Sequence, residues 1–122
     1  MTKSLNELRD EAFRIAREHG FKDASIPEDV ALMHSELSEL LEDFRAGKLA
    51  HVMTYVLNGV EVKTREVGGE LAKPCGIPSE LADVIIRVLH FSGKHGVDIE
   101  KAVIEKMAYN NTRPFKHGGK VL

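Results

Sequence analysis

The chain carries repeated start signals of α-helices. Ser4 and Ser25 are each followed three residues later by a glutamate, Glu7 and Glu28. In this capping-box pattern the serine and the glutamate satisfy free N–H groups at the start of a helix. Apolar residues at helical spacing follow each box, and a glycine then ends each run. Together with two later apolar runs, the pattern predicts four helices, over residues 5–19, 26–46, 80–94 and 99–113.

The two later helices have start signals of another kind. Ser79 follows Pro78 and is expected to cap the third helix, whereas Asp98 is expected to cap the fourth, which Pro114 closes. The third helix is apolar over most of its circumference. Because such a helix must be covered on nearly all sides, we expect the protein to be a homo-oligomer.

The segment between the second and third predicted helices has a strand pattern instead. Residues 53–57 and 60–67 alternate in the manner of strands, and Asn58-Gly59 between them suits a type I′ turn. The sequence therefore predicts an all-α, four-helix bundle-like fold with a small β-hairpin insertion over about 52–68 between the second and third helices. The sequence also predicts that residues 1–122 form a single domain, with a basic C-terminal tail over 114–122.

The composition excludes several classes of protein. At 122 residues the chain has the size of one domain. Its net charge of -2 argues against nucleic-acid binding, which usually needs a basic excess. It has no apolar run of about 18 residues and no signal-peptide pattern, so no membrane partner is expected. Cys75 is the only cysteine, which is typical of a cytoplasmic protein.

Two pairs of acids lie at helical spacing in different predicted helices. Glu36 and Glu39 belong to the second helix, and Glu80 and Asp83 to the third. Residues three apart share one face of a helix, and both pairs border the apolar face. Four carboxylates that converge between packed helices would bind a hard cation, Mg²⁺, with Mn²⁺ as a substitute. Such an ion takes phosphate oxygens as further ligands, so we expect a phosphorylated substrate.

Features of this acidic region have a second interpretation. A single Glu-x-x-Glu pair is most often ordinary surface charge. Arg87, on the acidic face of the third helix, either contacts a phosphate or forms a structural ion pair with Asp83 or Glu80. Asp43, one turn beyond Glu39, is either an additional ligand or a solvated acid.

The fourth predicted helix carries groups that suit an anionic substrate. Lys106, Asn110 and Arg113 recur at i, i+4 and i+7, on one face. Cations near a metal held by acids can bind the oxygens of a polyphosphate, and a guanidinium can do so with two hydrogen bonds. Tyr109, beside this face, is a candidate contact for a nucleotide base.

The basic tail adds two further candidates. His117 and Lys120 could bind substrate, the alternative being that the tail is a flexible basic end.

Taken together, these motifs resemble a known family. Glu36-x-x-Glu39, Glu80-Leu-Ala-Asp83 and the stretch KMAYNNTRPFKHGGK, residues 106–120, are similar to the MazG-like branch of the all-α nucleoside triphosphate pyrophosphohydrolases. The resemblance covers the second to fourth helices. It implies Mg²⁺-dependent hydrolysis of a ribo- or deoxyribonucleoside triphosphate between the α and β phosphates, giving a monophosphate and pyrophosphate. It also implies a homodimer or a dimer of dimers, with a role in nucleotide-pool house-cleaning.

The resemblance implies residue roles by position. The implied metal ligands are Glu36, Glu39, Glu80 and Asp83. Of these, Glu36 or Glu39 would also orient the attacking water and so be catalytic. The implied contacts to phosphate or sugar are Lys106, Asn110 and Arg113. Ser35 stands where many members have a second adjacent glutamate, which leaves the number of metal ions open, and the longer insertion leaves open the shape of the base pocket.

Other functions compete with this expectation. A non-catalytic helical dimer module that binds a metal or nucleotide would keep the same acids, and only product formation separates it from an enzyme. Phosphoribosyl-ATP pyrophosphohydrolase activity on a related fold is a second alternative. Nucleic-acid binding through the basic tail is the weakest.

Overall fold

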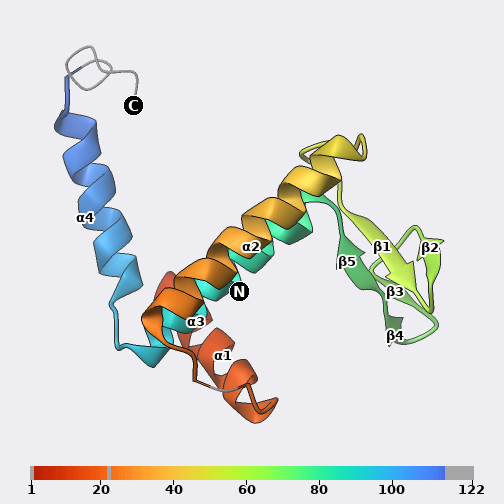
Figure 1. Cartoon of the computed structure of the whole chain (residues 1–122), viewed down its shortest axis with the longest axis horizontal. Helices are drawn as coiled ribbons and strands as arrows, with labels where there is room; N and C mark the ends of the chain where they lie inside the picture. Colours follow the sequence, from red (N-terminus) through yellow and green to blue (C-terminus); the bar gives the residue numbers. More distant parts are fainter. Residues whose placement is uncertain (1, 22, 115–122) are drawn as a thin grey trace. The chain divides into compact units, whose positions relative to one another are not determined.

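The computed structural model describes residues 2–21 and 23–114 (Figure 1). In chain order the elements are α1 (Leu5–Glu18), α2 (Ile26–Arg45), β1 (Thr54–Leu57), β2 (Val60–Val62), β3 (Glu66–Val67), β4 (Glu70–Leu71), β5 (Lys73–Cys75), α3 (Ile77–Lys94) and α4 (Ile99–Thr112). Contacts divide the chain into two compact units. Unit 1 comprises the described residues of 1–21 and 89–122, and unit 2 comprises those of 22–88. None of the described helices is long and apolar enough to cross a membrane.

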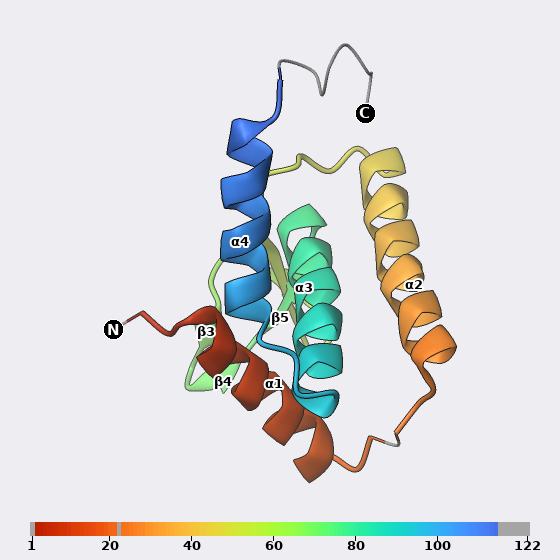
Figure 2. The same cartoon turned by 90° about the vertical axis from the view of Figure 1, so that its left-hand side faces the viewer.

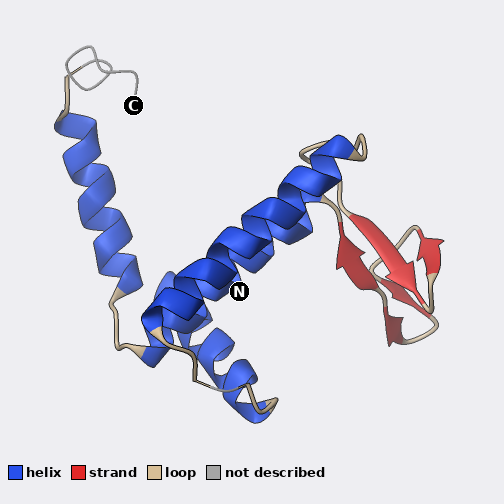
Figure 3. Cartoon of the chain, in the orientation of Figure 1, coloured by secondary structure: helices blue, strands red, loops and turns tan. Residues whose placement is uncertain are grey.

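The predicted all-α, four-helix bundle-like class is wrong, because the segment between α2 and α3 contains far more than a hairpin. It forms a three-stranded antiparallel sheet with the order β2-β1-β5 and a two-stranded sheet of β3 and β4, so the fold is mixed α and β (Figure 3). The predicted second strand stops at Val62, and residues 66–67 pair with 70–71 instead. Gly68 and Gly69, both with positive φ, form the turn of this additional hairpin.

The first turn of the sheet agrees with the sequence. Asn58 and Gly59 have φ values of 52° and 78°, as a two-residue turn of type I′ requires. Leu57 then pairs with Val60 across the turn. On the other side of β1, Tyr55 pairs with Pro74 of β5. Proline has no N–H group and so cannot donate a hydrogen bond to a neighbouring strand. It is tolerated here because β5 is an edge strand.

The helix starts follow the predicted caps with one exception. Both capping boxes are present, and the side chain of Asp98 accepts a hydrogen bond from Lys101 N–H at the start of α4. However, α3 begins at Ile77, so Ser79 lies inside the helix and does not cap it. Its hydroxyl donates to the Pro74 carbonyl at 3.1 Å. The position of Ser79 after Pro78 suggests a cap, but a proline also fits the first turn of a helix, as Pro78 does here.

A close backbone approach fixes the start of α3 within unit 2. Gly76 precedes the helix, and its carbonyl accepts a hydrogen bond from Glu80 N–H at 3.1 Å. Its φ of +97° favours glycine, and a Cβ there would lie 2.8 Å from the Val52 carbonyl oxygen. Ile77, the first helical residue, is one of the few buried apolar side chains, at 5% exposure. The first acid of α3 therefore sits in a well-anchored helical turn.

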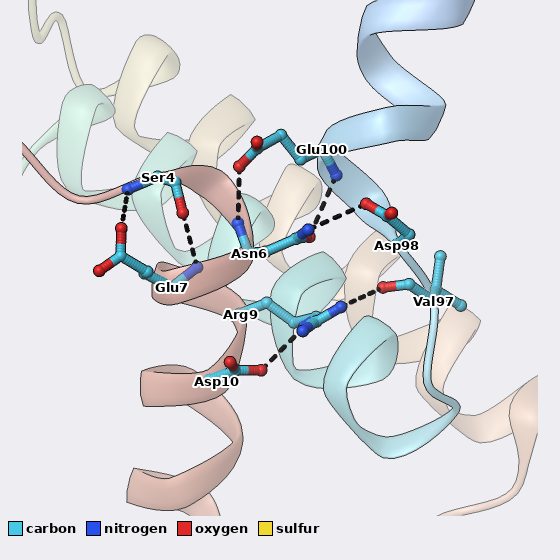
Figure 4. Close-up of polar contacts among 8 residues, drawn as sticks. All are labelled: Ser4, Asn6, Glu7, Arg9, Asp10, Val97, Asp98 and Glu100. Carbon is cyan, nitrogen blue, oxygen red and sulfur yellow. Dashed lines mark hydrogen bonds and ion pairs between the residues drawn. The ribbon is translucent and has the colours of Figure 1, made fainter.

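Unit 1 is held by reciprocal hydrogen bonds between the starts of α1 and α4 (Figure 4). Asn6 N–H donates to Glu100 Oε1, and Glu100 N–H donates back to Asn6 Oδ1, each at 3.2 Å. The Asn6 amide also donates to Asp98 at 2.9 Å, and Arg9 donates to the Val97 carbonyl at 2.8 Å. Each helix start thus supplies partners for N–H groups that the other helix leaves free.

Candidate metal site

The acids of α2 lie on a face that is only partly open to solvent. Glu36 is 8% exposed, and Asp43, two turns further on, is half-buried, whereas Glu39 between them is exposed. The box that starts at Ser25 and the uninterrupted helix to Arg45 bring these positions to successive turns of one side. Burial of a carboxylate is costly unless a cation or hydrogen-bond donors compensate it.

The acids of α3 face those of α2. In Figure 2, α2 and α3 run side by side in opposite directions. Glu80 and Asp83, in the first two turns of α3, are both half-buried. Carboxylate oxygens of Glu36, Glu80 and Asp83 all lie within 4.8 Å of one another. We call these three residues the acidic triad; all of them belong to unit 2.

The triad is electrostatically strained. Burial raises the pKa of Glu80, and the negative charges of Glu39, Asp83 and Asp43 raise it further. Burial also raises the pKa of Asp83, with added contributions from Glu36 and Glu39. Like charges held this close favour protonation or the binding of a cation. Glu39 therefore lies near enough to act on both acids of α3, although it is not a member of the triad.

Two carboxylate oxygens in this region have no donor. Glu80 Oε2 and Asp43 Oδ2 are buried and accept no hydrogen bond from the described part of the protein. The other carboxylate oxygen of Asp43, Oδ1, lies 3.7 Å from Lys48 Nζ. A buried oxygen without a donor is rare in folded proteins and requires a compensating partner. The residues therefore fit a hard divalent cation, because every ligand that they offer is a carboxylate oxygen.

Arg87 contacts the triad directly. Its Nε and Nη2 atoms donate to the same Glu36 oxygen, Oε1, at 3.3 Å and 3.2 Å. The two ion-pair partners considered from the sequence, Asp83 and Glu80, lie on its own helix, but the structure pairs it across to α2. Its positive charge also counteracts the rise in the pKa of Asp83.

Lys73 is a further member of this region that no sequence pattern indicates. It lies in β5, and its positive charge counteracts the rise in the pKa of Asp83, although less strongly than the charge of Arg87 does. Lys73 reaches this position because β5 pairs with β1 and leads directly into α3. Lys73 lies outside every predicted helix, so it could be identified only if β5 and its pairing with β1 were known.

The predicted substrate residues of the fourth helix belong to unit 1, whereas the acids belong to unit 2. Lys106, Tyr109 and Asn110 are exposed on α4. The helix ends at Thr112, and Arg113 has an extended backbone with ψ of 148°, so it does not continue the helical face as expected. Its guanidinium instead lies over the Tyr109 ring, 6.0 Å from the centroid.

The two predicted contacts in the tail, His117 and Lys120, lie outside the described residues. No family model, no curated protein and no solved structure matches the chain. The family that the motifs resemble therefore stays a prediction.

Proposed function

We propose that the protein is a Mg²⁺-dependent nucleotide pyrophosphohydrolase that converts a nucleoside triphosphate and water into a nucleoside monophosphate and pyrophosphate. The observation that carries the proposal is the convergence of Glu36, Glu80 and Asp83 within 4.8 Å of one another from two helices. The resemblance of the surrounding motifs to the MazG-like enzymes supports the same reaction. An oligomer, a dimer or a dimer of dimers, belongs to this proposal.

The acids are assigned to the cation and to the attacking water. Glu36, Glu80 and Asp83 would hold Mg²⁺, with Glu39 beside them. When bound, Mg²⁺ supplies positive charge that offsets the negative charge of the phosphate oxygens. We assign Glu39 to accept the proton of the attacking water, because its side chain is exposed and lies outside the triad. Glu36 is less suited to this role, since it is only 8% exposed and belongs to the triad that would hold the cation.

The remaining roles fall to donors. As the water oxygen bonds to phosphorus, the bond to the bridging oxygen breaks, and pyrophosphate leaves with the electron pair. Donors placed at the developing negative charge lower this barrier. We assign that role to Lys106, Asn110 and Arg113, on the pattern of the sequence, with Tyr109 as the contact to the base.

The experiment incubates the purified protein with Mg²⁺ and a panel of ribo- and deoxyribonucleoside triphosphates, together with phosphoribosyl-ATP, and measures pyrophosphate and the monophosphate. We expect both products in equal amounts from at least one nucleotide. Nucleotide binding without product would identify the non-catalytic module instead. No product and no binding across the panel would reject the proposal.

Substitutions within the site make the test specific. Glu39→Gln and Asp83→Asn should each reduce kcat by about a hundredfold or more, because each removes a charge that the reaction uses. Glu42→Gln is the matched control on α2, since the Glu42 side chain is 69% exposed and pairs with Arg45. Equal activity of Glu39→Gln and Glu42→Gln would remove Glu39 from the site.

A further inference from the structure

The contact between Arg87 and Glu36 has an uneven geometry. Both donors of Arg87 converge on Oε1 of Glu36. The Glu36 side chain is 11% exposed, whereas that of Arg87 is 38% exposed. The carboxylate is therefore held inside the site, while the guanidinium reaches it from the solvent side. Of the two partners, Arg87 is the more exposed one.

Charge makes this contact important for the site as a whole. Carboxylate oxygens of Glu36, Glu80 and Asp83 lie within 4.8 Å of one another, so the site favours any nearby positive charge. Arg87 supplies that charge to a carboxylate of the triad itself. A divalent cation bound to the same carboxylate would repel the guanidinium. The cation and Arg87 would therefore compete for the negative charge of the Glu36 carboxylate.

We propose that Arg87 is a stand-in counter-ion whose guanidinium holds Glu36 while no divalent cation is bound and is displaced from Glu36 when one binds. This inference rests on the proposed function, because it concerns the same metal site. Displacement frees the Nε and Nη2 donors of a residue one turn beyond Asp83. A guanidinium with free donors suits phosphate oxygens, so metal binding would prepare the site for its anionic substrate.

The displacement has a thermodynamic consequence. If Arg87 and the cation exclude each other at Glu36, each weakens the binding of the other by the same factor. Removal of the guanidinium should therefore tighten metal binding. A positioning role for Arg87, in which it orients Glu36 as a ligand, has the opposite sign, because loss of the orienting group would weaken metal binding.

The first measurement is the affinity for Mg²⁺ alone, by calorimetric titration, with no nucleotide present. We expect Arg87→Gln to lower the Kd for Mg²⁺ by about fivefold, the lower end of typical coupling between two sites. Arg45→Gln is the matched control, because Arg45 also pairs with a glutamate of α2, at 2.8 Å, but its side chain is 64% exposed. Its Kd should stay close to that of the unaltered protein.

The second measurement follows the Arg87 side chain directly. The Nε–H signal of Arg87 in a nitrogen-edited NMR spectrum is assigned by its loss in Arg87→Gln. We expect its exchange with water to accelerate during a Mg²⁺ titration, with the same midpoint as binding. The Nε–H signal of Arg45 should not change.

The outcomes separate this inference from the proposed function. If Mg²⁺ binds but Arg87→Gln leaves the Kd unchanged or raises it, displacement is rejected and the proposed enzyme is untouched. A Nε–H signal of Arg87 that stays protected at saturating Mg²⁺ rejects it as well. If Mg²⁺ does not bind the unaltered protein at all, both the metal site and the displacement are rejected.

Discussion

Gly93 of α3 lies against Phe13 of α1 so closely that a Cβ atom at position 93 would be 2.7 Å from the Phe13 Cβ. The same Cβ would lie 3.3 Å from the Arg9 carbonyl oxygen. Both neighbours are fixed to the backbone, so neither can turn away as the end of a flexible side chain could. Within unit 1, α1 and the last turn of α3 can approach each other this closely because residue 93 has no side chain.

Gly93→Ala should therefore destabilise the protein. Alanine favours a helix by about 1 kcal/mol over glycine, but overpacking typically costs about 1–3 kcal/mol. We expect a net loss of about 1 kcal/mol in the free energy of unfolding, measured by chemical denaturation. Ser35→Ala, at an exposed position of α2, is the control and should change stability little. A stability gain in Gly93→Ala would contradict the close packing.

A second glycine separates strain of the backbone from steric crowding. Gly76 and Gly59 both have positive φ, 97° and 78°, but only the Gly76 Cβ would meet another atom, the Val52 carbonyl oxygen at 2.8 Å. We expect Gly76→Ala to lower the free energy of unfolding by about 2 kcal/mol more than Gly59→Ala, because crowding adds to the cost of the left-handed conformation. Equal losses in thermal or chemical unfolding would show that crowding is unimportant there.

Asp98 should link the stability of unit 1 to pH. The hydrogen bond from the Asn6 side chain, and then that from Lys101 N–H, hold the pKa of Asp98 below its ordinary value of 3.8. A lowered pKa in the folded state means that this stabilisation is present above pH 3.8 and is lost as pH falls through the folded value. Asp98→Asn should remove this part of the acid sensitivity, as measured by thermal unfolding between about pH 2 and 5.

The test has a simple control. Asp10→Asn alters another exposed acid of unit 1. If it reduces the acid sensitivity as much as Asp98→Asn does, the contact between Asn6 and Asp98 is not responsible.

Metal binding should stabilise the fold. A ligand that binds only the folded protein adds about 2.7 kcal/mol at a hundred times its Kd, so saturating Mg²⁺ should raise Tm by several degrees over the protein in chelator. Asp83→Asn removes a member of the acidic triad and should lose most of this increase. An equal increase in both proteins would place the effect of Mg²⁺ outside the triad.

Local signals in the sequence predicted the helix starts well, because capping depends on residues that are neighbours in the chain. The boxes at Ser4 and Ser25 and the cap at Asp98 all appear in the structure. The turn at Asn58-Gly59 is predictable for the same reason. The predicted cap at Ser79 was wrong because the start of α3 depends on the packing of Gly76 against Val52, two residues far apart in sequence.

The strands after Val62 have a weak signal in the sequence, again for a physical reason. β3 and β4 have only two residues each, too few for an alternating pattern. Their overall pairing is visible only once Gly68-Gly69 is recognised as a turn. As a result, the sequence suggested one hairpin in an otherwise helical protein.

The candidate site, too, could be predicted from the sequence only in part. Helical spacing placed Glu36 beside Glu39 and Glu80 beside Asp83, and the meeting of Glu36, Glu80 and Asp83 follows once α2 and α3 lie side by side. Spacing could not reveal that Arg87 reaches across to Glu36, since its own helix offered nearer acids. These contacts depend on side-chain direction between helices, which a repeat pattern does not encode.

Pro74 has a consequence beyond its place in the sheet. β5 is an edge strand, and the exposed edge of a sheet is a template on which a strand from another molecule can add. A strand of three residues with proline at its centre offers few donors to such a strand. Pro74 thus also protects this edge of the sheet from edge-to-edge aggregation.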